Sequence, residues 1–139
     1  MRLEHANITV RNIDAVAKFL KTAFADFRVR GGGQSDAGGF HKRWQHFGND
    51  MTYIALEEVS REPHCIRKPY EDPGTNHVGF EVDDIDALHD RLCAAGYKGG
   101  FVPQERFRRR MYFLDGVGNE WEFIQYLSDK PSERNDYTA

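Results

Sequence analysis

The chain repeats itself once. Residues 5–10, His-Ala-Asn-Ile-Thr-Val, align with residues 77–82, His-Val-Gly-Phe-Glu-Val, at an offset of 72 residues. The same register continues into the next segment, where residues 12–16 align with residues 84–88. A repeat of about 70 residues is longer than the roughly 20–45 residues of a solenoid unit. The sequence therefore predicts two similar modules within a chain of 139 residues, a length typical of one domain.

Each module opens with a strand pattern followed by a helix pattern. In 5–10 and 77–82, apolar residues occupy every second position, which predicts a strand with one apolar and one polar face. Asn12 and Asp84 then suit helix N-caps, and Gly96 suits the left-handed residue after the second helix. Apolar residues form one stripe on each predicted helix, at positions 13, 16, 20 and 24 and at positions 85, 88, 92 and 95. We therefore expect each helix to cover the apolar face of its own sheet.

Three more strands are predicted after each helix. They span about 27–30, 40–47 and 51–59 in the first module, and 100–103, 109–114 and 120–126 in the second. The turn-forming residues 115–119 predict a hairpin. Residues 31–39, which begin with three glycines, and residues 60–76, which contain three prolines, are expected to be loops. The sequence thus predicts an α+β fold with one domain over residues 1–127, two βαβββ modules at about 1–60 and 74–127, and a polar tail over 128–139.

Charge and composition exclude several classes of function. The chain has 19 Lys and Arg against 22 Asp and Glu, a net charge of −3, so we expect no nucleic-acid partner. No apolar run approaches the roughly 18 residues of a membrane-spanning helix, and no export signal is visible. Cys65 and Cys93 lie outside any metal-binding spacing and are expected to be free thiols. These features favour a cytoplasmic protein with neither a nucleic-acid nor a membrane partner.

The candidate functional residues lie on the polar faces of the predicted sheets. His5 and His77 occupy matching positions in the two modules. Glu122 is expected on the same side, because Trp121 and Phe123 belong to the helix side. Two imidazoles and one carboxylate suit a divalent Fe, Mn, Ni or Zn ion and leave coordination positions open for substrate or water. We therefore predict a metal site formed by His5, His77 and Glu122.

The last strand of the first module supplies the counterpart of Glu122. Tyr53, Ala55 and Glu57 are expected on its polar face. Ala55 is the best placed of the three and cannot bind a metal. Glu57 could act as a catalytic base, although a register shift is needed to place it there. Tyr53 is predicted to line the substrate cavity.

The second module is expected to supply further substrate contacts. If Asp115 pairs with Glu120, then Phe113 lies opposite Glu122, and Arg109 shares its face. Phe113 would then add apolar wall, and Arg109 would suit a carboxylate or phosphate of the substrate. The alternative role for Arg109 is a charge that protects an edge strand from aggregation.

The doubled βαβββ pattern, the histidine that opens each module, and residues 112–123, Tyr-Phe-Leu-Asp-Gly-Val-Gly-Asn-Glu-Trp-Glu-Phe, together resemble the vicinal oxygen chelate superfamily. This superfamily comprises glyoxalases, bleomycin resistance proteins and extradiol dioxygenases. The resemblance implies a half-open barrel, completed in a homodimer where His5 of one chain can join His77 and Glu122 of the other. It also implies a divalent metal ion that is chelated by two vicinal oxygens of a small substrate and that stabilises an anionic intermediate.

Within that family, the set of metal ligands limits which activities are expected. Glyoxalase I holds its metal with a His, a Glu or Gln, a second His and a final Glu, and Ala55 stands at the second of these places. The remaining His5, His77 and Glu122 are similar to the set of extradiol dioxygenases and fosfomycin-inactivating transferases. We therefore expect a metal-dependent lyase, transferase or dioxygenase-like enzyme. Two alternatives remain: a metal-free protein that sequesters a ligand, as in the bleomycin resistance branch, and a structural or partner-binding domain whose histidines are coincidental.

Overall fold

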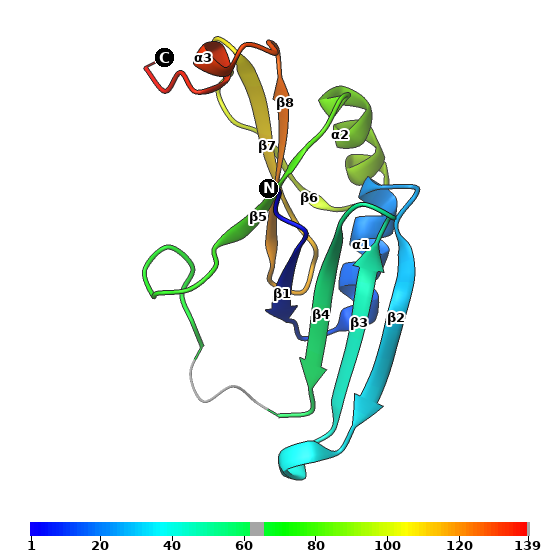
Figure 1. Cartoon of the computed structure of the whole chain (residues 1–139). Helices are drawn as coiled ribbons and strands as arrows, with labels where there is room; N and C mark the ends of the chain where they lie inside the picture. The colour runs from blue at the N-terminus through cyan, green and yellow to red at the C-terminus, as the bar shows by residue number, and fades with distance from the viewer. Residues whose placement is uncertain (62–65, 139) are drawn as a thin grey trace. The chain divides into compact units, whose positions relative to one another are not determined.

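The structure is a computed structural model that describes residues 1–61 and 66–138 (Figure 1). It contains two four-stranded sheets, and each sheet is accompanied by one longer helix. In chain order the elements are β1 (His5–Thr9), α1 (Ile13–Ala23), β2 (Arg28–Ser35), the 3-10 turn η1 (Ala37–Gly39), β3 (Lys42–Gly48), β4 (Tyr53–Val59), β5 (His77–Glu81), α2 (Ile85–Ala94), β6 (Lys98–Phe101), β7 (Arg108–Leu114), β8 (Glu120–Tyr126) and α3 (Pro131–Arg134).

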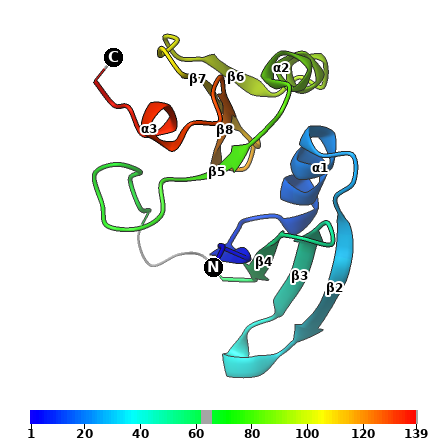
Figure 2. The ribbon, with the colours of Figure 1, turned by 45° about the horizontal axis from the view of Figure 1, so that its top comes forward.

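The two sheets have the same topology. Their strand orders are β1-β4-β3-β2 and β5-β8-β7-β6. In each sheet the first strand runs parallel to the last, and the other pairings are antiparallel. Helix α1 packs against β3 and β4, and α2 packs against β6, β7 and β8, so each helix lies beside its own strands (Figure 2). The predicted α+β fold of two βαβββ modules is confirmed.

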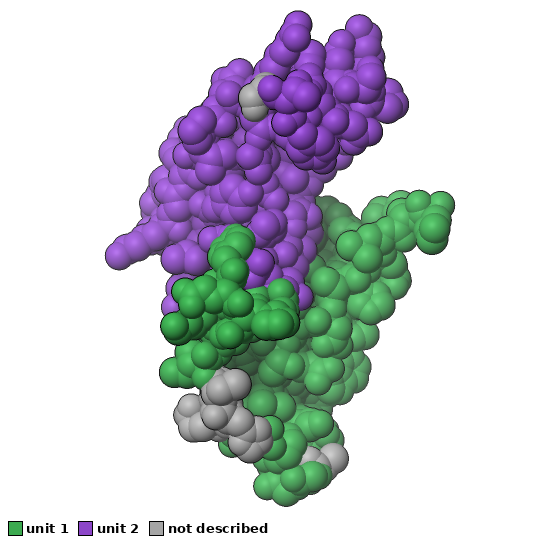
Figure 3. All heavy atoms as spheres, turned by 90° about the vertical axis from the view of Figure 1, so that its left-hand side faces the viewer, with its two compact units in different colours: residues 1–74 green, residues 75–139 purple. Residues whose placement is uncertain are grey.

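The chain divides into two compact units, residues 1–74 and 75–139, which Figure 3 shows in different colours. Each unit has its own core between helix and sheet. Burying one large apolar side chain contributes about 1.5–3 kcal/mol, so the apolar side chains of each core supply most of the stability of that unit. The fully buried members include Ile13, Val16, Phe19, Leu20 and Leu56 in unit 1, and Ile85, Leu88, Leu92, Met111, Phe113, Trp121 and Phe123 in unit 2.

The predicted helix starts are confirmed. The side chain of Asn12 accepts a hydrogen bond from the backbone N–H of Ala15 at 2.9 Å, and Asp84 accepts one from Ala87 at 2.9 Å. Both acceptors satisfy N–H groups that have no partner inside the helix. Gly96 has the predicted positive φ, 85°. The helices stop at residues 23 and 94, so positions 24 and 95, predicted as the last members of the two stripes, are C-caps instead.

The last strand of each unit also holds the helix start. A carboxylate oxygen of Glu58 accepts a hydrogen bond from the backbone N–H of Ile13 at 2.7 Å. At the matching place in unit 2, the side-chain oxygen of Gln125 accepts one from Ile85 at 3.3 Å. Because this hydrogen bond recurs, the two units share the contact between helix and sheet as well as the sequence repeat.

Residues 31–33, predicted as a flexible turn, instead belong to β2. Gly32 and Gly33 pair with Gln45 and Trp44 of β3. A Cβ atom at position 33 would lie 2.9 Å from the indole nitrogen of Trp44, and one at position 32 would lie 2.9 Å from the Trp44 carbonyl oxygen. The glycines are therefore required for close approach between strands rather than for a turn.

The predicted hairpin between β7 and β8 is confirmed. The carboxylate of Asp115, which is only 3% exposed, organises the turn. It accepts hydrogen bonds from the backbone N–H groups of Val117 and Asn119, from the Asn119 amide and from the indole N–H of Trp121, at 2.9, 3.1, 2.6 and 3.2 Å. The turn is thus tied to the core of unit 2 through Trp121.

The polar tail is partly ordered on unit 2. It includes α3, whose Arg134 binds the carboxylate of Glu81 with two hydrogen bonds of 3.0 and 2.6 Å. The Arg134 guanidinium also lies 3.8 Å from the centre of the Tyr126 ring.

Among the described residues, no helix has the length and apolar character that crossing a membrane would require. Cys93 is an exposed free thiol, whereas Cys65 lies outside the described residues.

Candidate functional site

His77 and Glu122 come together on the polar face of the second sheet. His77 opens β5, Glu122 lies in β8, and the distance from His77 Nε2 to Glu122 Oε2 is 3.1 Å. The Glu122 side chain is only 9% exposed. Gly79 is the direct partner of Glu122 in the β5–β8 pairing and carries no side chain that could cover the carboxylate. One oxygen of Glu122 is therefore left facing the imidazole.

The other oxygen of Glu122 is held by two donors from β7. The Tyr112 hydroxyl donates a hydrogen bond to Glu122 Oε1 at 2.6 Å, and Arg110 Nη1 donates one at 3.3 Å. Arg110 Nη1 also donates to the Tyr112 hydroxyl at 3.1 Å. These contacts fix the orientation of the carboxylate, which is how supporting residues usually hold a metal-binding carboxylate in place.

The spacing of the two donors fits a shared metal ion. Bonds of about 2.1 Å that meet near a right angle separate two donor atoms by roughly 3 Å, and the His77–Glu122 distance is 3.1 Å. In residues 1–61 and 66–138, however, no group of three or more His, Cys, Asp or Glu side chains lies close enough to hold an ion. Unit 2 thus brings together two of the three predicted ligands, and His5 belongs to unit 1.

His5 lies in an aromatic cluster on the polar face of the first sheet. Its ring stacks on Tyr53, with 4.7 Å between ring centres and 12° between planes, and its Nδ1 lies 2.8 Å from a carboxylate oxygen of Glu4. The Tyr53 ring also contacts His46, with centres 4.7 Å apart, and the guanidinium of Arg30 at 4.5 Å. Tyr53, predicted to line a substrate cavity, therefore packs against side chains of its own unit.

The strand register identifies Ala55 as the counterpart of Glu122. Ala55 pairs with Asn7, the third residue of β1, as Glu122 pairs with Gly79, the third residue of β5. Glu57 lies two residues further along β4, where one of its oxygens accepts a hydrogen bond from the Asn7 amide at 3.0 Å. Its carboxylate is thus engaged one strand step away from the place that corresponds to Glu122.

The predicted register of the β7–β8 hairpin is wrong by one residue. Tyr112, not Phe113, pairs with Glu122, and Phe113 pairs with Trp121. The cause is the turn: the backbone N–H of Asp115 donates to the Asn119 carbonyl, so the strands end before Asp115. Phe113 consequently lies in the core, fully buried on the helix side, and does not line the polar face. Tyr112 is the residue that the sequence reasoning missed.

The same shift moves Arg109 to the helix side. Its guanidinium binds the Asp86 carboxylate of α2 through two hydrogen bonds of 2.5 and 2.7 Å. In unit 1, Arg43 binds Asp14 of α1 in the same way, at 2.7 and 2.6 Å. The hydrogen bonds from Arg43 and Arg109 lower the pKa of Asp14 and of Asp86. Arg109 therefore joins helix to sheet instead of facing a substrate on the polar side.

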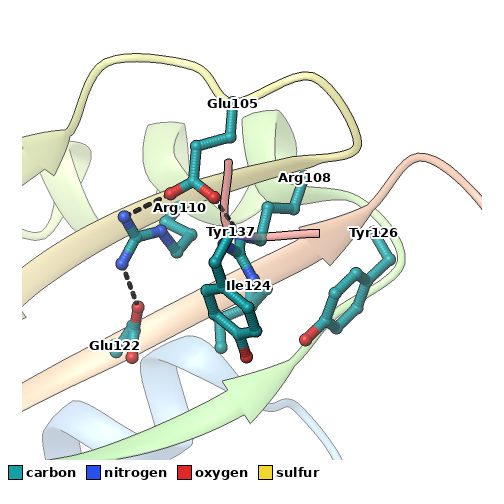
Figure 4. A pocket seen from close by; sticks show the side chains of 7 residues that line it. All are labelled: Glu105, Arg108, Arg110, Glu122, Ile124, Tyr126 and Tyr137. Atoms are coloured by element: carbon teal, nitrogen blue, oxygen red, sulfur yellow. Dashed lines mark hydrogen bonds and ion pairs between the residues drawn. The ribbon is translucent and has the colours of Figure 1, made fainter. Parts of the chain in front are cut away.

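A cavity of about 330 Å³ adjoins Glu122 in unit 2 (Figure 4). It holds a second carboxylate, Glu105, which contacts Nε of Arg108 and Nη2 of Arg110. Burial acts to lower the pKa of Arg108, but the hydrogen bonds and charges of Glu105 and Tyr137 together raise that pKa above its ordinary value. Both arginines are therefore charged. The lining residues are Glu105, Arg108, Arg110, Glu122, Ile124, Tyr126 and Tyr137.

Comparison with known proteins yields one family and many structures of the same fold. The family model described as the Glyoxalase/Bleomycin resistance protein/Dioxygenase superfamily matches residues 2–123. No curated protein matches the chain significantly.

Three similar solved structures cover nearly the whole chain. A glyoxalase family protein from Bacillus cereus has a TM-score of 0.71 at 18% identity, over 92% of this chain and 95% of its own. A glyoxylase/bleomycin resistance protein/dioxygenase domain from Frankia sp. EAN1pec has a TM-score of 0.71 at 22% identity, over 91% and 98%. The fosfomycin resistance protein FosX from Listeria monocytogenes has a TM-score of 0.70 at 18% identity, over 96% and 97%. At these identities the likeness establishes a shared fold.

Proposed function

Because the chain belongs to the Glyoxalase/Bleomycin resistance protein/Dioxygenase superfamily, we propose that it is a divalent-metal-dependent enzyme acting on a small oxygenated substrate. His77 and Glu122 are the two metal ligands of unit 2, for an Fe, Mn, Ni or Zn ion. His5 is the third ligand, supplied by the same chain or by a second copy in a homodimer. The observation that carries the proposal is the 3.1 Å approach of His77 Nε2 to Glu122 Oε2.

The residues around Glu122 have defined tasks in this proposal. Tyr112 and Arg110 hold one carboxylate oxygen, so the other keeps its direction. Gly79 leaves that oxygen uncovered on the β5 side. The bound ion would polarise substrate oxygens and stabilise negative charge that develops on them, as in lyase, transferase or dioxygenase-like reactions. Glu57 is the candidate base in unit 1, held by Asn7.

A relative with the same fold supports a metal. Structures of Listeria FosX include complexes with Mn(II), one with a sulfate ion and one with 1S,2S-dihydroxypropylphosphonic acid. Those structures share 17% identity with this chain. We extend from them only the expectation of a divalent ion.

A metal-free binding protein is the second candidate function. It is favoured by one observation: Glu122 already has charge and hydrogen-bond partners in His77, Arg110 and Tyr112. A carboxylate satisfied in this way does not need an ion to be stable in a buried position. In this case the cavity beside Glu122 would bind its ligand without chemistry.

Metal analysis separates the two candidates. We expect the purified protein to bind Mn(II) or Zn(II) at one ion per site in calorimetric titration, and His77→Ala to weaken that binding at least 100-fold. His41→Ala is the matched control, because His41 is a half-exposed histidine of unit 1 that contacts Asp36. His5→Ala tests the third ligand separately. Binding that survives His77→Ala contradicts the metal site, and absence of binding in the wild type supports the metal-free candidate.

A further inference from the structure

The cavity beside Glu122 contains two arginines that are bridged by one carboxylate. Glu105, on the segment between β6 and β7, contacts Arg110 with Oε1 and Arg108 with Oε2 (Figure 4). The side chains of Glu105 and Arg108 are only 18% and 8% exposed. Because a single carboxylate bridges both guanidinium groups, it occupies the position that the carboxylate or phosphate of an anionic ligand would otherwise take.

Two further donors of these arginines are also engaged. Arg110 Nη1 donates to Glu122 and Tyr112. Arg108 Nη2 donates to the backbone carbonyl of Asp136 at 3.4 Å, and its guanidinium lies 4.2 Å from the centre of the Tyr137 ring. Two arginines thus face two glutamates in the lining, and their charges balance.

One donor in this group has no partner. Arg110 Nε is buried and makes no hydrogen bond with any described residue. Buried N–H groups are almost always satisfied, so an orphaned one indicates an acceptor that the chain itself does not supply. Side chains of Ile124, Tyr126 and Tyr137 form the rest of the lining. The lining therefore combines paired charges with aliphatic and aromatic surface, and one of its arginines has a buried N–H that lacks an oxygen acceptor.

We propose that this cavity binds an uncharged, oxygen-bearing group of a small molecule and that Glu105 is the residue that excludes anions from it. The proposal rests on the proposed function to the extent that the cavity adjoins the metal ligand Glu122. An entering anion would meet the carboxylates of Glu105 and Glu122 beside guanidinium groups that are already paired. Specificity built from such a repulsive element is a common device in recognition.

Acetamide and acetate test this directly, because they have nearly the same shape and differ in charge. Both are titrated into ¹⁵N-labelled protein, as purified and after EDTA treatment, and the Arg110 Nε–Hε resonance is followed by NMR. We expect the wild type to bind acetamide in preference to acetate. Glu105→Gln should raise the acetate-to-acetamide affinity ratio at least tenfold. Glu71→Gln, which removes an exposed carboxylate paired with Lys68, is the matched control and should leave the ratio unchanged.

The outcomes are separable from those of the metal experiment. Wild-type protein that binds acetate as well as acetamide overturns the proposal, even if Glu105→Gln does not fold. Wild-type protein that binds neither probe at 100 mM overturns the assignment of the cavity as a ligand site. A ratio that Glu105→Gln does not change shows that Glu105 is not the selective residue. The EDTA-treated sample gives these results whether or not His77 and Glu122 bind a metal.

Discussion

The polar faces of the two sheets are built on one plan and differ in chemistry. β3 presents Trp44 and His46, and β7 presents Arg110 and Tyr112 at the matching positions of the strand register. In unit 1 these side chains belong to an aromatic cluster with Tyr53. In unit 2 they bind carboxylates through hydrogen bonds and ion pairs.

The contacts that the units share lie on the helix side. Both units have the same N-cap, the same hydrogen bond from helix start to last strand, and the same arginine–aspartate pair. On the polar side the opening histidine is common to both units, while Ala55 stands at the place of Glu122. The comparison teaches that the repeated residues stabilise the fold, whereas the divergent ones give unit 2 the carboxylate ligand of the proposed metal site.

Glu122→Ala gives unit 2 the residue that unit 1 has at position 55, and this variant should reduce metal affinity more than any other variant considered. We expect metal affinity to fall by more than the roughly 10–100-fold that loss of a supporting partner costs, because a ligand itself is removed. The protein should stay folded, since alanine is accommodated at the matching position 55, where it is 3% exposed. Calorimetric titration with Mn(II) and thermal unfolding measure the two quantities, with exposed Glu71→Ala as control. Unchanged affinity would remove Glu122 from the site.

Tyr112→Phe should have a smaller effect on the same measurement. The variant removes the hydroxyl that holds Glu122 Oε1 at 2.6 Å. We expect metal affinity to fall roughly 10–100-fold, as is usual for a residue that orients a ligand. His46→Phe, the equivalent change in unit 1, should leave affinity unchanged. Equal effects of the two variants would show that the polar faces are not divided as described.

The smallest effect is expected on the helix side, where the units agree. Arg43→Met removes the ion pair with Asp14, whose side chain is 71% exposed, and should reduce the free energy of unfolding by about 0.2–1 kcal/mol. Arg109→Met should act in the same direction through Asp86.

The pH dependence follows from the aspartates. Hydrogen bonds from the arginines lower the pKa of Asp14 and of Asp86 in the folded state. The ion pairs therefore contribute stability above the pKa of an unfolded aspartate, and this contribution is lost as pH falls through the folded pKa. Denaturant unfolding of wild type and Arg43→Met should thus differ near pH 7 and converge in acid. A difference that persists in acid would assign the effect to packing of the arginine stem.

Much of the fold could be predicted because its signals are local. The alternating strands, Asn12, Asp84 and Gly96 act within a few residues of themselves, and the structure places each as expected. The strand conformation of residues 31–33 could not be predicted, since three consecutive glycines are compatible with both a turn and a strand. For Gly33 the reason is the side chain of Trp44, which reaches β2 from the neighbouring strand, and for Gly32 it is the Trp44 carbonyl.

The candidate site was less predictable because it depends on register. A shift of one residue in the β7–β8 pairing moves every side chain to the opposite face. That shift exchanges Phe113 for Tyr112 and sends Arg109 to the helix. Glu105 and Arg108 could not be found from the pattern, since the segment that carries Glu105 has no periodicity. Whether His5 joins His77 and Glu122 remains a prediction for the metal titration.

The parallel pairing of first and last strands has a consequence for how each unit assembles. The partners of His5 and His77 in their sheets, Tyr53 and Glu120, lie more than forty residues away along the chain. Bringing such distant segments together has a higher entropic cost than forming the adjacent hairpins, so β1 and β5 are expected to dock late during folding. Both opening histidines arrive with those late strands. A ligand that binds either histidine would accordingly slow unfolding by retaining the strand that is added last.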